Sequence, residues 1–309
     1  MKKYKIAVGL ILLVTTLTAC EKEQQPHEPV LPGELPKRNY GGPVWGPNNT
    51  ILFRHTPANI DSSGLWQINT DGTDQRFFLP TYFDLPDWSP DGQWLALGKG
   101  AQIYKINVTK DILVQLTTDP LRKFHPSWSP DGKWITFHIN DGDYSEWGIW
   151  AVSANGDEKR QILQIAGLNP DWSPGGNQIC FVGWPGDERK SKLLIMSSTG
   201  SNLKTVFDPS KHGFEDTNDI DHPSFSPDSK KIVFQVDSAE NRDAQIWLVN
   251  VDGSNPRRIT SNGGIEPSWS PDGRWLVYVR FSYYNAEQTG NGKLWVMDAN
   301  GKNKRQFTL

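Results

Sequence analysis

Two histidines and a glutamate stand at equivalent places in a repeated phrase of this 309-residue chain. His125, His222 and Glu266 each come directly before a proline, a serine and an aromatic residue. Imidazole and carboxylate groups are common metal ligands. A metal site would require the fold to bring these side chains together, so the elements that carry them decide what they can do.

Two other segments carry residues of chemical interest. The acidic residues Asp216, Asp219 and Asp221 could bind Ca²⁺, although the spacing of an EF-hand loop is absent. Tyr283 and Tyr284 are adjacent, and tyrosine is enriched at binding hot spots. They could anchor a partner, or one ring could pack against the last repeat.

Motifs of common enzymes are missing from the sequence. It contains no Gly-rich phosphate loop, no Cys-x-x-Cys pair and no Gly-x-Ser-x-Gly elbow. We therefore expect no catalytic residue and no cofactor. The 32 basic residues against 35 acidic ones leave no excess to neutralise a nucleic-acid backbone. Cys180 is predicted to be a buried strand residue, because it occupies a place that Thr and Val fill in other repeats.

The repeated phrase is Pro-x-Trp-Ser-Pro-Asp-Gly or a close variant of it. Its aromatic residues are separated by 40 to 53 residues, the period of a four-stranded propeller blade. The six aromatic positions are Trp45, Trp88, Trp128, Trp172, Phe225 and Trp269.

Each unit contains signals for four strands. Ser-Pro-Asp-Gly forms a tight turn between the first two, and the second strand is apolar on both faces, as at 134–137. A third strand such as 149–152 leads to a hairpin at Asn155-Gly156 and a short polar fourth strand. The sequence thus predicts an all-β fold, a six-bladed β-propeller of four-stranded antiparallel blades over residues 41–309. The strand order predicts that no strand is exchanged between the two ends.

Insertions fall on one face of the predicted propeller. The turns on the opposite face are short, and in repeat proteins the face with insertions usually binds. The insertions are 140–146, 183–192, 208–221, 237–243 and 281–293. The residues before each repeat proline should surround the channel mouth on the same face: Gly42, Leu85, His125, Asn169, His222 and Glu266.

This placement argues against a metal. His125 and His222 belong to the third and fifth units, so we expect them to face each other across the channel rather than at ligand spacing. We predict that they hydrate the channel mouth or contact a partner.

The N-terminus predicts an export signal. Three lysines precede an apolar run over 6–14, and Cys20 follows small residues. We interpret 1–19 as a signal peptide, and 20–40 as a lipidated cysteine followed by a Pro-rich, extended tether.

The segment ending at Cys20 resembles the lipobox of bacterial lipoproteins, in which that cysteine is acylated. The repeats over 41–309 look like the TolB-type β-propeller repeat. The resemblance implies a six-bladed propeller in the bacterial envelope that binds other proteins. TolB itself has an α/β domain before its propeller, whereas a tether is predicted here, so the chain looks TolB-like without being TolB.

The main functional hypothesis is a monomeric, lipid-anchored binding scaffold for envelope proteins, on the extracytoplasmic side, with no nucleic acid. One alternative is a propeller enzyme with a metal at the channel mouth, such as a sugar-acid lyase. Another is a polysaccharide-binding accessory protein. The candidate partner-binding residues are Tyr283, Tyr284, Glu215, Asp216, Asp219 and Asp221, and the channel-mouth candidates are His125, Asn169, His222 and Glu266.

Overall fold

The computed structural model describes residues 40–308 apart from 48, 57–62, 81–84, 186–189, 215–219, 238–243 and 281–291. All of them belong to one compact unit, Arg38–Leu309. Among the residues described, no helix has the length and apolar character needed to cross a membrane.

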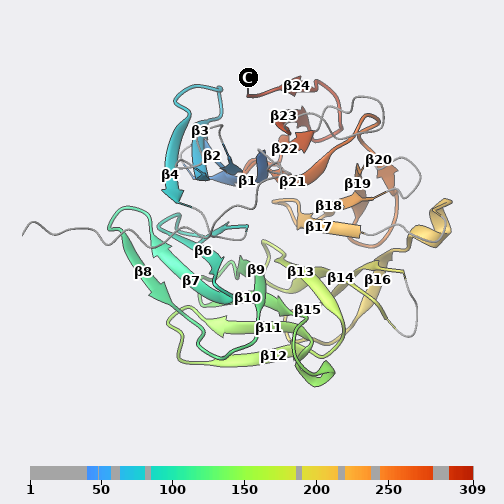
Figure 1. Cartoon of the computed structure of the whole chain (residues 1–309). Coiled ribbons are helices and arrows are strands. Elements are labelled where there is room, and N and C mark those ends of the chain that lie inside the picture. Colours follow the sequence, from blue (N-terminus) through green and yellow to red (C-terminus); the bar gives the residue numbers. More distant parts are fainter. Residues whose placement is uncertain are drawn as a thin grey trace, which may run out of the picture. The chain divides into compact units, whose positions relative to one another are not determined.

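The described chain forms six sheets of four antiparallel strands, each made of strands consecutive in sequence. Figure 1 shows the sheets around a common centre, with first strands innermost and fourth strands at the rim. The predicted six-bladed β-propeller is confirmed.

Blades 1 to 3 have these bounds: β1 (Tyr40–Gly46), β2 (Thr50–His55), β3 (Gly64–Asn69) and β4 (Arg76–Pro80); β5 (Asp87–Trp88), β6 (Trp94–Lys99), β7 (Gln102–Asn107) and β8 (Ile112–Gln115); β9 (Lys123–Trp128), β10 (Trp134–Ile139), β11 (Gly148–Ser153) and β12 (Lys159–Leu163). Blades 4 to 6 have these: β13 (Gly167–Trp172), β14 (Gln178–Gly183), β15 (Lys192–Ser197) and β16 (Lys204–Phe207); β17 (Ile220–Phe225), β18 (Lys231–Val236), β19 (Gln245–Asn250) and β20 (Arg257–Arg258); β21 (Ile265–Trp269), β22 (Trp275–Arg280), β23 (Lys293–Asp298) and β24 (Arg305–Gln306). Within the described ranges, short 3₁₀ helices lie at Tyr144–Glu146 and Pro209–His212.

The repeated phrase forms its turn through side chains as well as backbone. In blade 2, the Ser89 hydroxyl accepts the Trp94 N–H at 2.9 Å and donates to Asp91 at 2.5 Å. Asp91 also accepts the Gln93 N–H, and Gly92 takes a left-handed φ of 67°. The Ser-Pro-Asp-Gly sequence is therefore needed because each polar group satisfies a backbone group of the turn.

The second strand of each blade is buried on both faces. In β10, β14 and β18 every residue after the first is buried, which is expected for a sheet packed between two neighbours. Cys180, in the middle of β14, is fully buried, and burial raises the pKa of its thiol. Its prediction as a buried strand residue is confirmed.

Side chains close the ring between the last blade and the first. Every blade uses only its own four strands, so the prediction that no strand is exchanged is confirmed. Across the seam, Trp45 donates its indole N–H to the Ser268 carbonyl at 3.1 Å. The Gly42 N–H donates to the Glu266 carboxylate at 2.6 Å.

Candidate functional site

The first strands of all six blades line a central channel of about 420 Å³. The six residues that precede the repeat prolines lie on it, as predicted, and we call them the channel-mouth ring: Gly42, Leu85, His125, Asn169, His222 and Glu266.

Backbone geometry sets the direction of the ring side chains. Five of the six residues have φ between 48° and 54°, in the left-handed region, and Leu85 is the exception. For the four residues other than glycine this conformation costs on the order of 1 kcal/mol each. At Gly42 an added Cβ would lie 1.8 Å from Leu85 Cδ2, so glycine is also required there by close packing.

The strained residues sit in a bulge repeated in five blades. In blade 5, Asp221 pairs with Gln235 and Ser224 with Val233, so His222 and Pro223 together oppose one residue of β18. The same register break occurs in β1, β9, β13 and β21. A bulge redirects a side chain, and here it directs the ring residue toward the channel. The proline that follows has no backbone N–H to donate, and the bulge places it where the ladder requires no such bond.

The two ring histidines are close together. The rings of His125 and His222 meet edge to face with centroids 5.5 Å apart. The two rings are therefore closer than the expectation of a wide separation across the channel implied; both residues have the left-handed backbone of the bulge. His138 of β10 stacks on His125 at 5.3 Å, and Phe124 stacks on His138 at 5.4 Å.

Asp221 holds this cluster in place. Its carboxylate accepts the His222 N–H at 3.0 Å, lies 3.2 Å from His222 Nδ1 and accepts a bond from the Asn169 side-chain amide. Burial would raise the pKa of Asp221, but the charge and hydrogen bonds of His222, together with the charge of His125, lower it to about 2. The carboxylate is thus anionic at neutral pH.

Polar residues at the fifth position of some second strands support the ring. His138 Nδ1 accepts the Asn169 N–H at 3.2 Å, and Gln235 Oε1 accepts the Glu266 N–H at 3.1 Å. The sequence interpretation missed these residues. A signal was available, because other second strands, such as those of blades 4 and 6, have valine at this position.

Further polar side chains line the channel at the residue after the repeat proline in five of the six blades. Asp87 accepts the Trp128 N–H of the next blade at 2.6 Å, and Asp171 accepts the Phe225 N–H at 2.7 Å. Burial raises the pKa of Asp87 to about 6. Burial, with a further contribution from the charge of Asp87, raises that of Asp171 to about 8. The sequence interpretation did not single out either carboxyl group.

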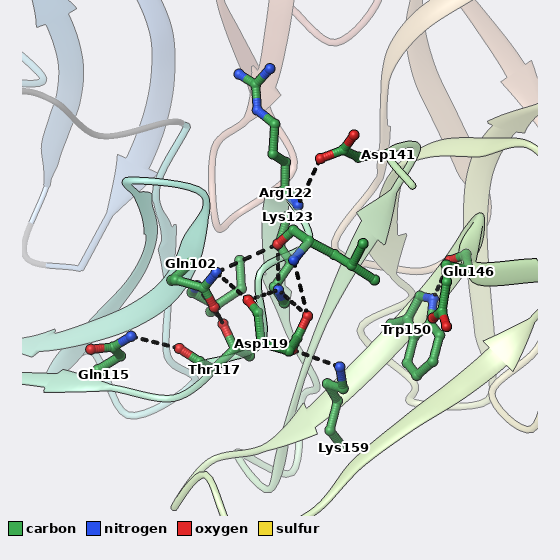
Figure 2. A network of polar contacts seen from close by, with 12 residues as sticks. Gln102, Gln115, Thr117, Asp119, Arg122, Lys123, Asp141, Glu146, Trp150 and Lys159 are labelled. Atoms are coloured by element: carbon green, nitrogen blue, oxygen red, sulfur yellow. Dashed lines mark hydrogen bonds and ion pairs between the residues drawn. The ribbon is translucent and has the colours of Figure 1, made fainter. Parts of the chain in front are cut away.

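A polar network fixes the start of the strand that carries His125 (Figure 2). The buried Lys123 amine donates to the Asp119 carboxylate at 2.7 Å and to the Leu121 carbonyl, and Lys159 contacts the other Asp119 oxygen at 2.7 Å. Gln102 donates to the Asp119 carbonyl at 2.6 Å. Burial lowers the pKa of Lys123, and its pairing with Asp119 opposes this effect. The network joins blades 2 and 3 beside the mouth.

His138 does not add a metal ligand to the mouth. His138 accepts a backbone N–H through Nδ1, so its proton resides on Nε2 and neither nitrogen is available as a ligand. No group of three His, Cys, Asp or Glu side chains able to hold a metal occurs within the described ranges.

Several predicted residues cannot be placed. Cys20, Glu215, Asp216, Asp219, Tyr283 and Tyr284 lie outside the described residues. Of the predicted acidic group, Asp221 is described and lies beside the ring.

Comparison with known proteins decides the family. The profile of the TolB beta propeller domain matches residues 154–309, half of the chain. The chain belongs to this family.

The TolB-like propeller is similar to two proteins from Agrobacterium. The uncharacterized protein Atu1656 of Agrobacterium fabrum is 28% identical over 240 residues, 72% of this chain and 75% of that protein. A structure from Agrobacterium tumefaciens assigned to TolB is 24% identical, with a TM-score of 0.63 over 76% of this chain and 84% of that one.

Oligogalacturonate lyase has the same fold. One structure comes from Vibrio parahaemolyticus and another is a complex with manganese; they are 13% and 14% identical, with TM-scores of 0.59. Each covers 88% of this chain, and 78% and 77% of the lyase chains. At these identities the likeness concerns the fold alone.

Proposed function

We propose that this TolB-like propeller is a membrane-anchored lipoprotein of the bacterial envelope that binds a protein partner, without catalysis, through the face that carries the channel mouth. The observation that supports it most is the channel-mouth ring. Four residues other than glycine hold a costly left-handed conformation at one place, and strain of this kind concentrates at ligand-binding sites.

The chemistry of the ring favours recognition. Asp221 fixes His222 and Asn169 in defined positions, and the N–H groups of Asn169 and Glu266 are already satisfied. A surface whose side chains are held before binding loses little entropy when a partner docks. The sequence predicts that the long insertions lie on the same face.

A photo-crosslinking experiment tests the face. A photoreactive amino acid placed at Leu85, which lines the channel, should give a discrete adduct with an envelope protein in living cells. Replacement of Tyr283 and Tyr284 by alanine should weaken binding of that protein by about 2 kcal/mol or more if these tyrosines are hot spots.

Exposed side chains beside the short turns provide the matched control. Lys133 and Arg274 are 76% and 81% exposed, and Lys230 lies in the equivalent turn of blade 5. The photoreactive group at these sites should give no such adduct. Adducts from the turn face and none from the mouth would place recognition on the opposite face.

Attachment to the membrane is the second part of the proposal. It rests on the resemblance of the segment before Cys20 to a lipobox, and several acyl chains on one residue anchor a protein stably. We expect Cys20→Ser to abolish membrane attachment and normal processing, as seen by fractionation and by apparent mass. A variant that stays with the membranes at the parental mass would contradict the lipoprotein hypothesis.

The metal-dependent lyase is the weaker candidate. The fold of the lyases and the 5.5 Å approach of His125 to His222 are consistent with it. The third histidine is excluded as a ligand by its hydrogen bond to Asn169. The binding scaffold is therefore the function that the mouth supports better.

A further inference from the structure

A basic pocket that shares no lining residue with the channel lies where strands β18 to β20 of blade 5 meet the turn between β23 and β24 of blade 6. It has a volume of about 470 Å³ and a buried leucine among its lining residues. Three cations and three amides line it with Leu248, and no acidic residue does: Lys231, Arg257, Lys302, Asn250, Asn255 and Asn300. We call it the blade 5 pocket.

Other blades have a different residue at the position of Lys231, the first residue of the second strand. The first residue of the second strand is tryptophan in blades 2, 3 and 6. In blade 3 the Arg160 guanidinium lies 4.1 Å over the Trp134 ring, and in blade 2 Lys105 lies 4.3 Å over Trp94. These cations are stabilised by an aromatic face.

Blade 5 has a lysine where those blades have the tryptophan. Strand register places Arg257 opposite Leu248, as Arg160 lies opposite Ala151, so Arg257 is the counterpart of Arg160. Lys231 occupies the place of Trp134. Arg257 thus shares its pocket with a second cation instead of an indole ring.

Asp228 and Asp298 lie near the pocket and interact electrostatically with Lys231 and Lys302, but neither carboxylate lines it. Arg257 donates to the Asn300 carbonyl at 3.1 Å, and among the described residues no ion pair involves Arg257, Lys231 or Lys302. The nearby Asp298 accepts the backbone N–H groups of Asn300 and Lys302. Like charges that share a pocket repel each other, and a bound anion removes that repulsion.

We propose that the blade 5 pocket binds a phosphate group. A phosphate carries a charge of about −1.5 to −2, which balances three cations better than one carboxylate does. Arginine can bind two of its oxygens at once, and the asparagine amides supply further donors. The site goes beyond the proposed partner binding, because it lies at the turn-face ends of the outer strands. A free phosphorylated compound and an anionic lipid headgroup share this chemistry.

The pocket of blade 4 offers a matched control within the same chain. It has a volume of about 410 Å³, with Gln178 in the place of Lys231, Asn202 in that of Asn255 and Lys204 in that of Arg257. It has one cation instead of three, and we expect it to bind phosphate weakly or not at all.

Calorimetric titration of the full-length protein in detergent with inorganic phosphate tests the proposal. The parent should bind at low salt, and Lys231→Gln and Arg257→Gln should each weaken binding at least tenfold. Lys204→Gln, in the blade 4 pocket, should leave binding unchanged. Lack of binding by the parent, or an equal loss in Lys204→Gln, overturns the proposal.

A further variant separates loss of the site from damage to the fold. Lys231→Trp restores the tryptophan of the other blades beneath Arg257, so it should abolish phosphate binding and raise the melting temperature. Damage to the blade would instead lower both the phosphate affinity and the melting temperature. If Lys231→Trp retains phosphate binding, the pocket is not the site.

Two further ligands identify the source of the phosphate. Free glycerol phosphate, if bound as tightly as inorganic phosphate and lost in Lys231→Gln, indicates a soluble ligand. Preference for mixed micelles with phosphatidylglycerol over phosphatidylcholine, also lost in that variant, indicates a lipid headgroup. If Lys231→Gln and Arg257→Gln still bind these micelles like the parent, the blade 5 pocket is not the phosphate site.

Discussion

In several blades the side chain after the repeat proline accepts a hydrogen bond from the next blade. Asp87, Ser127 and Asp171 each accept the backbone N–H of the aromatic residue in the next blade. Serine supplies this acceptor with a neutral hydroxyl group. Aspartate meets it with a carboxyl group that burial keeps protonated over part of the physiological range, so two of these contacts depend on pH.

We therefore predict a stability change between pH 5 and pH 8. The pKa of Asp171 is about 8 in the folded protein and near 3.8 in the unfolded chain, so its contribution is fully present below about pH 4 and is lost as the pH rises through 8. Asp171→Asn keeps an acceptor for the Phe225 N–H and removes the titration. In urea unfolding its stability should fall less steeply with pH than that of the parent, by up to about 1.4 kcal/mol per pH unit. Equal slopes would contradict the assignment.

At the scale of the element, the threonine that ends a repeat has a defined task. Thr117, Thr260 and Thr308 accept the backbone N–H of the second residue of the third strand in their own blade, at 2.8 to 3.2 Å. The fourth strands are short, so this hydroxyl replaces a ladder bond that the fourth strand does not supply. An apolar residue followed by this threonine thus marks where blades 2, 5 and 6 are completed.

Replacement of one such threonine should destabilise the propeller. Thr260→Val keeps the shape but leaves the buried Ile246 N–H without its acceptor, which costs about 1–3 kcal/mol. The exposed Thr205 on β16 is the control, and Thr205→Val should change the free energy of unfolding by less than about 0.5 kcal/mol. Unfolding of Thr260→Val at the parental urea concentration would show that the hydroxyl is dispensable.

Much of the fold follows from the sequence. The period of the phrase and its turn chemistry predicted the blades, their strand order and the location of the ring residues. The proximity of His125 to His222 was not foreseen. It depends on the left-handed backbone of each histidine, which lies in a bulge of its own blade and directs the side chain toward the channel. The raised pKa of Asp171 was also out of reach, since it arises from burial against a neighbouring blade.

For the whole molecule, the open ring makes one blade interface different from the other five. Adjacent blades elsewhere are joined by a chain link. Among the described residues, blades 6 and 1 are held by packing and by contacts such as Glu266 with Gly42 and Ser268 with Trp45. Opening at this seam breaks no covalent connection and releases both ends of the propeller at once. We expect it to be the easiest opening of the ring.

Hydrogen exchange measures this difference directly. Glu266→Ala removes the buried carboxylate that accepts the Gly42 N–H, and loss of a charged hydrogen bond costs about 1.5–3 kcal/mol. Since 1.4 kcal/mol corresponds to a factor of ten, amides of β1 and β21 should exchange about ten to a hundred times faster. Ser127→Ala, which weakens the linked interface of blades 3 and 4, should have a smaller and local effect. If Glu266→Ala accelerates exchange equally in all six blades, the ring opens as a unit and the seam is not its weakest interface.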